Sequence, residues 1–223
     1  MNKNLWIIAN FKSRKNIQEV LNWIGEVGPK LIKKDNLKIA VCPSYSCLSE
    51  AKKAIQVGNF PLLLGSQNLS NFPAGAYTGE EPAEALKEFV DLSIIGHSER
   101  RQNFKETNEQ IAQKIHLANQ SGIEPLLCIQ GEDTLIPDVV KLVAYEPVFA
   151  IGTGTPDTPE NANKVALSVK QKHSANLEVL YGGSVDEKNV KSFINQENIN
   201  GILVGNASLD PLSFLNIINN CLS

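Results

Sequence analysis

The sequence predicts a single-domain α/β protein in which eight parallel strands and their connecting helices close into a (β/α)₈ barrel. Eight short apolar segments alternate with helical or helix-sized segments, and this alternation is typical of a parallel sheet covered by helices. The 223 residues divide into roughly 28 per unit, near the least that a strand and its crossover helix need. The length lies in the lower part of the range of eight-unit barrels, and no linker or low-complexity stretch indicates a second domain.

The first four units are marked by short apolar runs that polar residues or turn formers bound. Runs such as LWIIA and PLLLG have no polar alternation, which is typical of strands buried on both faces. After the first run, Ile17, Val20, Leu21, Ile24 and Val27 recur at helical spacing. We therefore expect strands at 5–10, 37–42, 61–67 and 91–98, helices at 16–33, 46–57 and 82–89, and a long turn-rich loop at 68–80.

The last four units carry clearer signals for helix starts. Asp157 or Thr158 can cap a helix that has Pro159 at or near its first position. Ser184 and Glu187 have the spacing of a capping box. We therefore expect strands at 124–130, up to residue 146, at 177–181 and at 201–206, and helices at 105–120, 158–173, 184–194 and 212–221.

Composition excludes several classes of function. The formal net charge of −3 provides no basic excess to neutralise phosphates, so we expect no general nucleic-acid binding. The apolar run Leu5–Ala9 is too short for a signal-peptide core or a membrane span, so we expect no membrane association and a cytoplasmic protein. Four cysteines without a CxxC pair or zinc-like histidine spacing are expected to be buried thiols: Cys42, Cys47, Cys128 and Cys221.

Polar residues gather where the predicted strands end. In a barrel of this kind the functional site lies at the C-terminal ends of the strands. These residues are Asn10 and Lys12 after the first strand, His97, Ser98 and Glu99 after the fourth, Glu146 at the end of the sixth, Gly182-Gly183-Ser184 after the seventh and Gly205-Asn206 after the eighth. One cation, one imidazole, one carboxylate and two small-residue turns are therefore expected at one rim.

Each of these groups has a chemical reason to be there. The carboxylate of Glu146 can abstract a proton next to a carbonyl, and the enediolate that results needs stabilisation where its charge develops. His97 can hydrogen-bond the carbonyl oxygen, and Lys12 supplies positive charge beside it. The helix that begins near Ser98 and Glu99 points its N-terminus at His97, which disfavours the imidazolium and supports a neutral ring.

Backbone N–H groups form the second half of the predicted site. Gly152, Ser184 and the Gly205-Asn206 turn offer such groups, two of them at expected helix starts, and helix N-termini bind phosphate. Glu146 is followed by Pro147, which pushes it into an extended conformation and gives its side chain a defined direction. The apolar residues 148–151 then lie between this proline and glycines, which favours a segment that excludes water from the site.

These motifs together resemble the triosephosphate isomerase family over nearly the whole chain, which implies a single-domain TIM barrel. The matching stretches are ANFK (9–12), GSQNLS…GAYTGE (65–80), IIGHSERR (94–101), LLCI (126–129), AYEPVFAIGTG (144–154), YGGSV (181–185) and GILVGNASL (201–209). The resemblance implies interconversion of dihydroxyacetone phosphate and glyceraldehyde 3-phosphate without a cofactor. It implies that Glu146 is the base, His97 the electrophile, Lys12 the substrate-binding cation, Asn10 a substrate-orienting residue, and Gly152, Ser184, Gly205 and Asn206 phosphate-binding positions.

The resemblance also implies self-association. Members of this family are mostly homodimers in which the third loop of one subunit braces the site of the other, and some short members are tetramers, so both states are open. The corresponding loop here is 68–80, whose Phe72 and Tyr77 are exposed apolar groups unless a partner covers them.

Three positions depart from the family pattern. The fifth unit is short, because 131–140 leaves room for only about two turns of helix. Phe149 stands where a tryptophan is usual, so the indole N–H is absent. Asn206 replaces a glycine, and because asparagine tolerates a left-handed backbone, we expect phosphate binding to be kept.

Two alternative functions follow from the same residues. One is a phosphate-binding barrel that acts on a different phosphorylated sugar. The other is a catalytically silent barrel that binds a phosphorylated metabolite or a partner protein, and phosphate binding without isomerisation would favour it.

Overall fold

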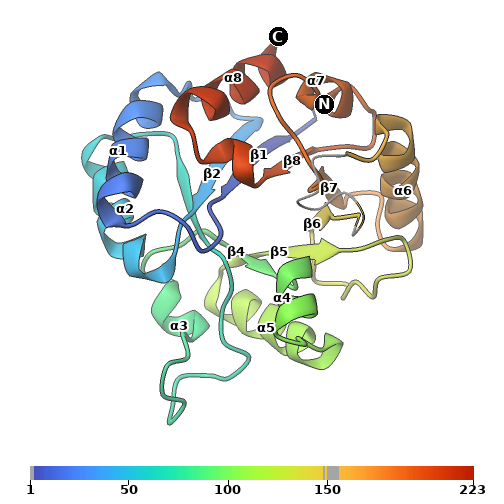
Figure 1. The fold of residues 1–223 in the computed structure, drawn as a ribbon. Helices are drawn as coiled ribbons and strands as arrows, with labels where there is room; N and C mark the ends of the chain where they lie inside the picture. The colour runs from blue at the N-terminus through green and yellow to red at the C-terminus, as the bar shows by residue number, and fades with distance from the viewer. Residues whose placement is uncertain (1–2, 148, 150–155) are drawn as a thin grey trace.

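The predicted (β/α)₈ barrel is confirmed. A computed structural model describes residues 3–147, 149 and 156–223, and in it eight parallel strands form a closed barrel in sequence order from β1 to β8 (Figure 1). Every neighbouring pair of strands is parallel, and β1 pairs with β8 to close the ring. The strands are β1 (Leu5–Asn10), β2 (Leu37–Cys42), β3 (Leu63–Ser66), β4 (Leu92–Ile95), β5 (Glu124–Ile129), β6 (Leu142–Tyr145), β7 (Glu178–Tyr181) and β8 (Gly201–Val204).

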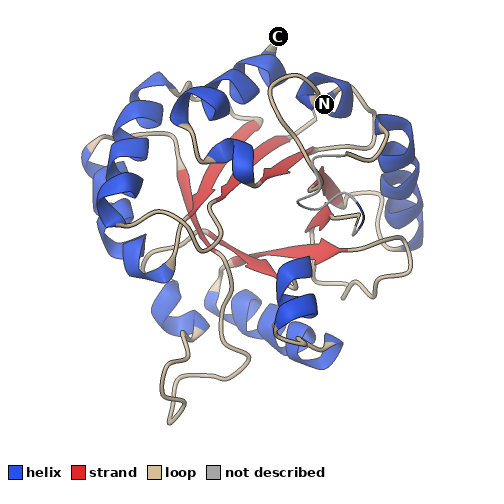
Figure 2. Ribbon diagram, viewed as in Figure 1, coloured by secondary structure: helices blue, strands red, loops and turns tan. Residues whose placement is uncertain are grey.

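Helices surround the ring of strands (Figure 2). The α-helices are α1 (Ile17–Val27), α2 (Leu48–Val57), α3 (Ala83–Leu86), α4 (Ser98–Asn103), α5 (Asn108–Ser121), α6 (Pro159–Lys172), α7 (Val190–Ile194) and α8 (Pro211–Leu222), and short 3₁₀ turns lie at Gly28–Lys30, Tyr45–Cys47 and Asn206–Ser208. Thr158 caps α6 with Pro159 in its first turn, as the sequence predicts. The first helix is shorter than expected, because Gly28 and Pro29 convert its end to a 3₁₀ turn.

The predicted capping box at Ser184 is wrong. Helix α7 begins at Val190, and Ser184 lies six residues before it. The reciprocal bonds are instead made by Asp186 and Asn189, each of whose side chains accepts the backbone N–H of the other. The polar run after β7 therefore forms a tight turn before the helix, because these two residues satisfy the backbone that a capping box would have used.

The connection between β5 and β6 contains no helix. All of its residues, 130–141, are described, and they form turns and extended chain, so the room that the sequence leaves for about two helical turns is not used for a helix. Ile136 and Val140 are buried in the core, whereas Leu135 and Val139 are exposed. The segment is fastened to α6 by Lys172, whose ammonium lies 3.2 Å from Asp133 Oδ1. A crossover of a dozen residues is thus enough here to return the chain to a parallel strand.

Alternation along each strand separates two apolar layers. One layer lies between the strands and the helices, and the other is contributed by Trp6, Ile8, Ala40, Cys42, Leu92, Ile94, Leu126, Cys128, Leu142, Ala144, Leu180 and Leu203. Successive side chains of a strand point to opposite faces, so this second set, spaced by two along the strands, fills the barrel interior. Continuing it by two residues gives Asn10 on β1 and Glu146 after β6, which directs both toward the mouth of the barrel.

None of the described helices combines the length and the hydropathy that a membrane crossing requires.

Candidate active site

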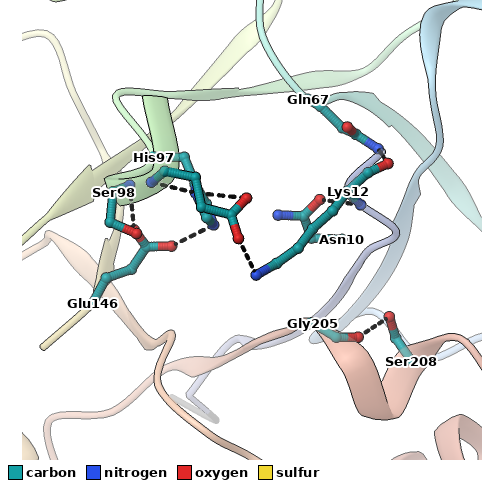
Figure 3. Close-up of polar contacts among 9 residues, drawn as sticks. Asn10, Lys12, Gln67, His97, Ser98, Glu146, Gly205 and Ser208 are labelled. Carbon is teal, nitrogen blue, oxygen red and sulfur yellow. Dashed lines mark hydrogen bonds and ion pairs between the residues drawn. The ribbon is translucent and has the colours of Figure 1, made fainter. Parts of the chain in front are cut away.

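A cavity of about 240 Å³ lies at the C-terminal ends of the strands. Side chains and turns from β1, β4, β6, β7 and β8 line it, and Figure 3 shows the polar side chains converging there. Of the predicted site residues, Ser98, Glu99 and Gly152 are not in the lining. The lining includes the others, which are Asn10, Lys12, His97, Glu146, Ser184, Gly205 and Asn206. Gly152 lies outside the described residues. So do residues 148, 150 and 151 of the expected water-excluding segment 148–151.

Glu146 and His97 are in direct contact within the cavity. Glu146 is only 1% exposed, and its Oε1 lies 3.0 Å from Nε2 of His97. The other carboxylate oxygen accepts the backbone N–H of Ser98 at 2.9 Å. Ser98 is the first residue of α4, so the carboxylate rests on the positive end of that helix. A buried negative charge is thereby hydrogen-bonded through both oxygens, as burial requires.

His97 is the N-cap of α4, so the N-terminus of this helix points at it, as the sequence predicts. Its Nδ1 accepts the backbone N–H of Glu99 at 3.2 Å. A ring nitrogen that accepts a hydrogen bond carries no proton, so the arrangement holds the neutral tautomer with its N–H at Nε2. That N–H points into the cavity toward Glu146 and is placed to donate to a bound oxygen.

Lys12 brings the positive charge. Its Nζ lies 2.5 Å from Oε1 of Glu99, and both side chains are partly exposed. Its backbone is left-handed, with φ +53, and the side chain of Asn10 accepts its N–H at 3.0 Å. The ammonium therefore approaches the histidine from the opposite side of the cavity to the carboxylate (Figure 3).

The turns after β7 and β8 bring backbone to the cavity wall. A Cβ at Gly182 would lie 3.0 Å from Cγ of Glu146, and one at Gly183 would lie 2.2 Å from the Tyr181 hydroxyl oxygen, so a side chain at either position would crowd a buried group. At the β8 turn, a Cβ on Gly205 would lie 3.4 Å from Cε of Lys12. The cation thus lies beside the turns whose N–H groups are suited to an anion.

The left-handed backbone expected for Asn206 is not present. Gly205 has φ −88 and Asn206 opens a 3₁₀ turn, and neither has a positive φ. Ser208 holds this turn, because its backbone N–H and its hydroxyl both donate to the Gly205 carbonyl, at 2.9 and 2.7 Å. Asparagine is therefore accommodated without strain.

Comparison with known proteins agrees with this geometry. The family model described as Triosephosphate isomerase matches residues 5–135 and 136–221. The chain belongs to the triosephosphate isomerase family. Proteins named triosephosphate isomerase from Alkaliphilus metalliredigens and Aquifex aeolicus are each 37% identical to it, over 246 and 243 residues, covering 96% and 95% of this chain and 98% and 97% of the relatives. The protein of that name from Mesomycoplasma hyopneumoniae is also 37% identical, over 244 residues, 96% of this chain and 98% of the relative.

The chain is a short member of this family of isomerases. The alignments with these relatives run over more residues than the 223 of the chain, so the relatives contain residues that this chain lacks. The family match divides between residues 135 and 136, within the helix-free connection after β5. The short fifth unit predicted from the sequence is therefore a shortening of the family fold at this connection.

Three residues around the site have contacts that sequence reasoning missed. Burial raises the pKa of the Cys128 thiol, and the charge of Glu146 and a hydrogen bond to it raise that pKa further, so a thiol lies under the carboxylate. Gln67 donates to the Lys12 carbonyl at 2.7 Å. Asp157 donates its N–H to the Tyr181 hydroxyl at 2.8 Å. Only the thiol was foreseeable, since its position two residues beyond Leu126 places it in the interior-facing row of β5.

Proposed function

We propose that this protein interconverts dihydroxyacetone phosphate and D-glyceraldehyde 3-phosphate through an enediolate, without a cofactor. Membership of the triosephosphate isomerase family supports the substrate pair. The single observation that carries the mechanism is the contact of one carboxylate with one histidine N–H, with Lys12 across the same cavity. A proton acceptor, a neutral hydrogen-bond donor and a cation are the groups that this isomerisation needs.

In the proposed mechanism, Glu146 is the base. Its carboxylate removes a proton from the carbon next to the carbonyl, and the electrons of that C–H bond form the enediolate double bond. The carbonyl oxygen takes up the resulting negative charge and accepts the hydrogen bond of His97 Nε2. The hydroxyl on the deprotonated carbon then loses its proton, which passes to the former carbonyl oxygen, and becomes the new carbonyl. Glu146 returns its proton to the former carbonyl carbon, which gives the other triose. Since Glu146 and His97 contact each other directly, the substrate must enter between them and the carboxylate must turn toward its carbon.

Lys12 and the backbone turns bind the substrate in this proposal. The ammonium offsets the phosphate charge and the developing oxyanion, while Asn10 orients the substrate beside it. Gly152, Ser184, Gly205 and Asn206 supply phosphate-binding positions, three of which line the cavity. Ser98 and Glu99 support the three catalytic side chains. Ser98 donates its backbone N–H to Glu146, and Glu99 contacts both Lys12 and His97.

The decisive experiment is proton exchange in the Glu146→Gln variant. The amide keeps the size of the side chain but cannot take up the substrate proton, so exchange of the triose C2 proton into D₂O should be lost while the circular dichroism spectrum is unchanged. Wild-type exchange would contradict the assignment of the base. His97→Gln and Lys12→Ala should lose most turnover, and a coupled assay with both trioses distinguishes this function from that of a silent or differently specific barrel.

We further propose that the protein acts as a homodimer in the cytoplasm. Phe72 and Tyr77 stack at 4.4 Å on the loop after β3 and are 40% and 42% exposed. This loop extends away from the barrel (Figure 1), and a second subunit would cover its rings. The free thiols of Cys42, Cys47 and Cys128 are consistent with a reducing compartment. Light scattering of the purified protein distinguishes a monomer, dimer and tetramer.

A further inference from the structure

The backbone of Lys12 is held in a conformation that lysine rarely adopts. Its φ of +53 lies in the left-handed region, where the Cβ crowds the following carbonyl oxygen. Residues in such regions persist only where their surroundings hold them there. The backbone N–H of Lys12 donates to Asn10 Oδ1 at 3.0 Å, and its carbonyl needs a second partner to hold this conformation.

The side-chain amide of Gln67 holds that carbonyl. Gln67 is the first residue after β3, and its Nε2 donates to the Lys12 carbonyl at 2.7 Å and to the Cys42 carbonyl at 2.9 Å. The carbonyl of Cys42 also accepts the backbone N–H of Phe11, at 3.1 Å. Both protons of one amide group are thus used to join the chain after β1 to the end of β2, as Figure 3 shows for the contact with Lys12.

Holding both backbone polar groups of Lys12 sets the direction in which its side chain leaves the backbone. With its N–H and its carbonyl both bonded, the Cα–Cβ bond of Lys12 has one direction, and the side chain reaches Glu99 with Nζ 2.5 Å from Oε1. Its Cε passes beside Gly205, where an added Cβ would lie at 3.4 Å. If the carbonyl were released, the residue could return to the right-handed or extended region, and the ammonium would leave this position.

We propose that Gln67 is a positioning residue that directs the Lys12 ammonium to the phosphate and oxyanion of the substrate. The proposal rests on the substrate-binding role proposed above for Lys12. Gln67 does not line the cavity among the described residues, so it acts through Lys12. A structural role alone, as a staple between β2 and the chain after β3, would lower stability without acting through the cation.

A double-mutant cycle tests this. Gln67→Met keeps the length of the side chain and removes both donors, and it should raise the inhibition constant of inorganic phosphate and the KM for the triose by about three- to tenfold, the effect of one lost hydrogen bond. In a Lys12→Ala background the same substitution should change neither constant, since the group that it positions is absent. Gln67→Asn, shorter by one methylene, provides a milder version should the methionine variant fail to fold.

Ser66→Ala is the matched control. Ser66 precedes Gln67, is fully buried, and donates to the Ser93 hydroxyl at 2.8 Å. Its loss should lower the melting temperature and leave phosphate inhibition unchanged. Equal effects of Gln67→Met with and without Lys12, or unchanged constants in the wild-type background, would overturn the inference alone. An active, normally binding Lys12→Ala variant would instead overturn the proposed role of Lys12, and the inference with it.

Discussion

Replacing Lys114 by methionine should destabilise the barrel more than the removal of an exposed ion pair would. Lys114 is 3% exposed, and its Nζ contacts Glu106 Oε1 and lies 2.7 Å from Asn68 Oδ1. Burial raises the pKa of Glu106, but the hydrogen bonds and charges of Lys114 and Arg100 outweigh burial and lower it. Removing the ammonium leaves a buried carboxylate whose second oxygen already has no hydrogen-bond partner among the described residues.

The magnitude follows from what remains. Breaking a buried pair by removing one partner costs about 3–5 kcal/mol, and the lower figure applies because Arg100 Nε stays 3.0 Å from the same oxygen of Glu106. For a chain of this size about 3 kcal/mol corresponds to a fall of roughly 6–12 °C in Tm. Since the pKa of Glu106 is lowered in the folded protein, its carboxylate stabilises the fold at pH values above the pKa of the unfolded state. That stabilisation is lost as the pH falls, so the difference in Tm between the wild type and Lys114→Met should narrow below about pH 4.

Thermal unfolding followed by circular dichroism measures this difference. The control is Lys53→Met, which removes an exposed pair in which Nζ lies 2.7 Å from Glu50 Oε1 and should cost less than about 1 kcal/mol. If Lys114→Met lowers Tm no further than Lys53→Met, the reasoning from burial fails. Glu106→Gln combined with Lys114→Met should recover part of the loss, because it removes the uncompensated charge.

Two further predictions concern strand closure and alkaline pH. Gly201→Ala should destabilise the fold by at least about 2 kcal/mol, since φ is +155 and the new Cβ would lie 2.1 Å from the Trp6 carbonyl oxygen; a denaturant midpoint within error of wild type would contradict it. Burial raises the pKa of Tyr181 to about 12, and burial followed by the charge of Asp157 raises that of Tyr145. Because the unfolded state then loses these protons first, the unfolding free energy should fall as pH rises from about 10 toward 12. Tyr145→Phe should make this fall shallower, and an unchanged slope in denaturant titrations would refute the assignment.

Much of the fold could be predicted from the sequence because its signals are local. An apolar run is buried on both faces wherever it sits in a parallel barrel, so all eight strands were found within a few residues. The helix start at Thr158 was recognisable because a cap acts within its own turn. The start of α7 was not, since Ser184 and Glu187 have capping-box spacing while Asp186 and Asn189 make the bonds, and two overlapping local patterns cannot be ranked without coordinates.

The site could be predicted only as far as strand ends determine it. The end of a parallel strand places Asn10, His97 and Glu146 at one rim whatever the details of packing. Contacts between side chains from different units depend on the register of the closed barrel, which no local pattern encodes. The amide of Gln67 reaches a carbonyl 55 residues earlier, and the Glu99 carboxylate reaches an ammonium 87 residues earlier.

At the helix-free link after β5, the pairing of two strands is separated from the covering of the barrel by a helix, although a βαβ unit usually provides both. There the strand ladder alone joins β5 to β6, with four registered residue pairs, while the outer layer is reduced to a strap held by Ile136 and Val140. The missing helix would cover the side of the barrel, whereas the reacting groups lie at the C-terminal ends of the strands. A designer seeking a smaller isomerase scaffold could therefore trim the circumference of the molecule while leaving its chemistry untouched.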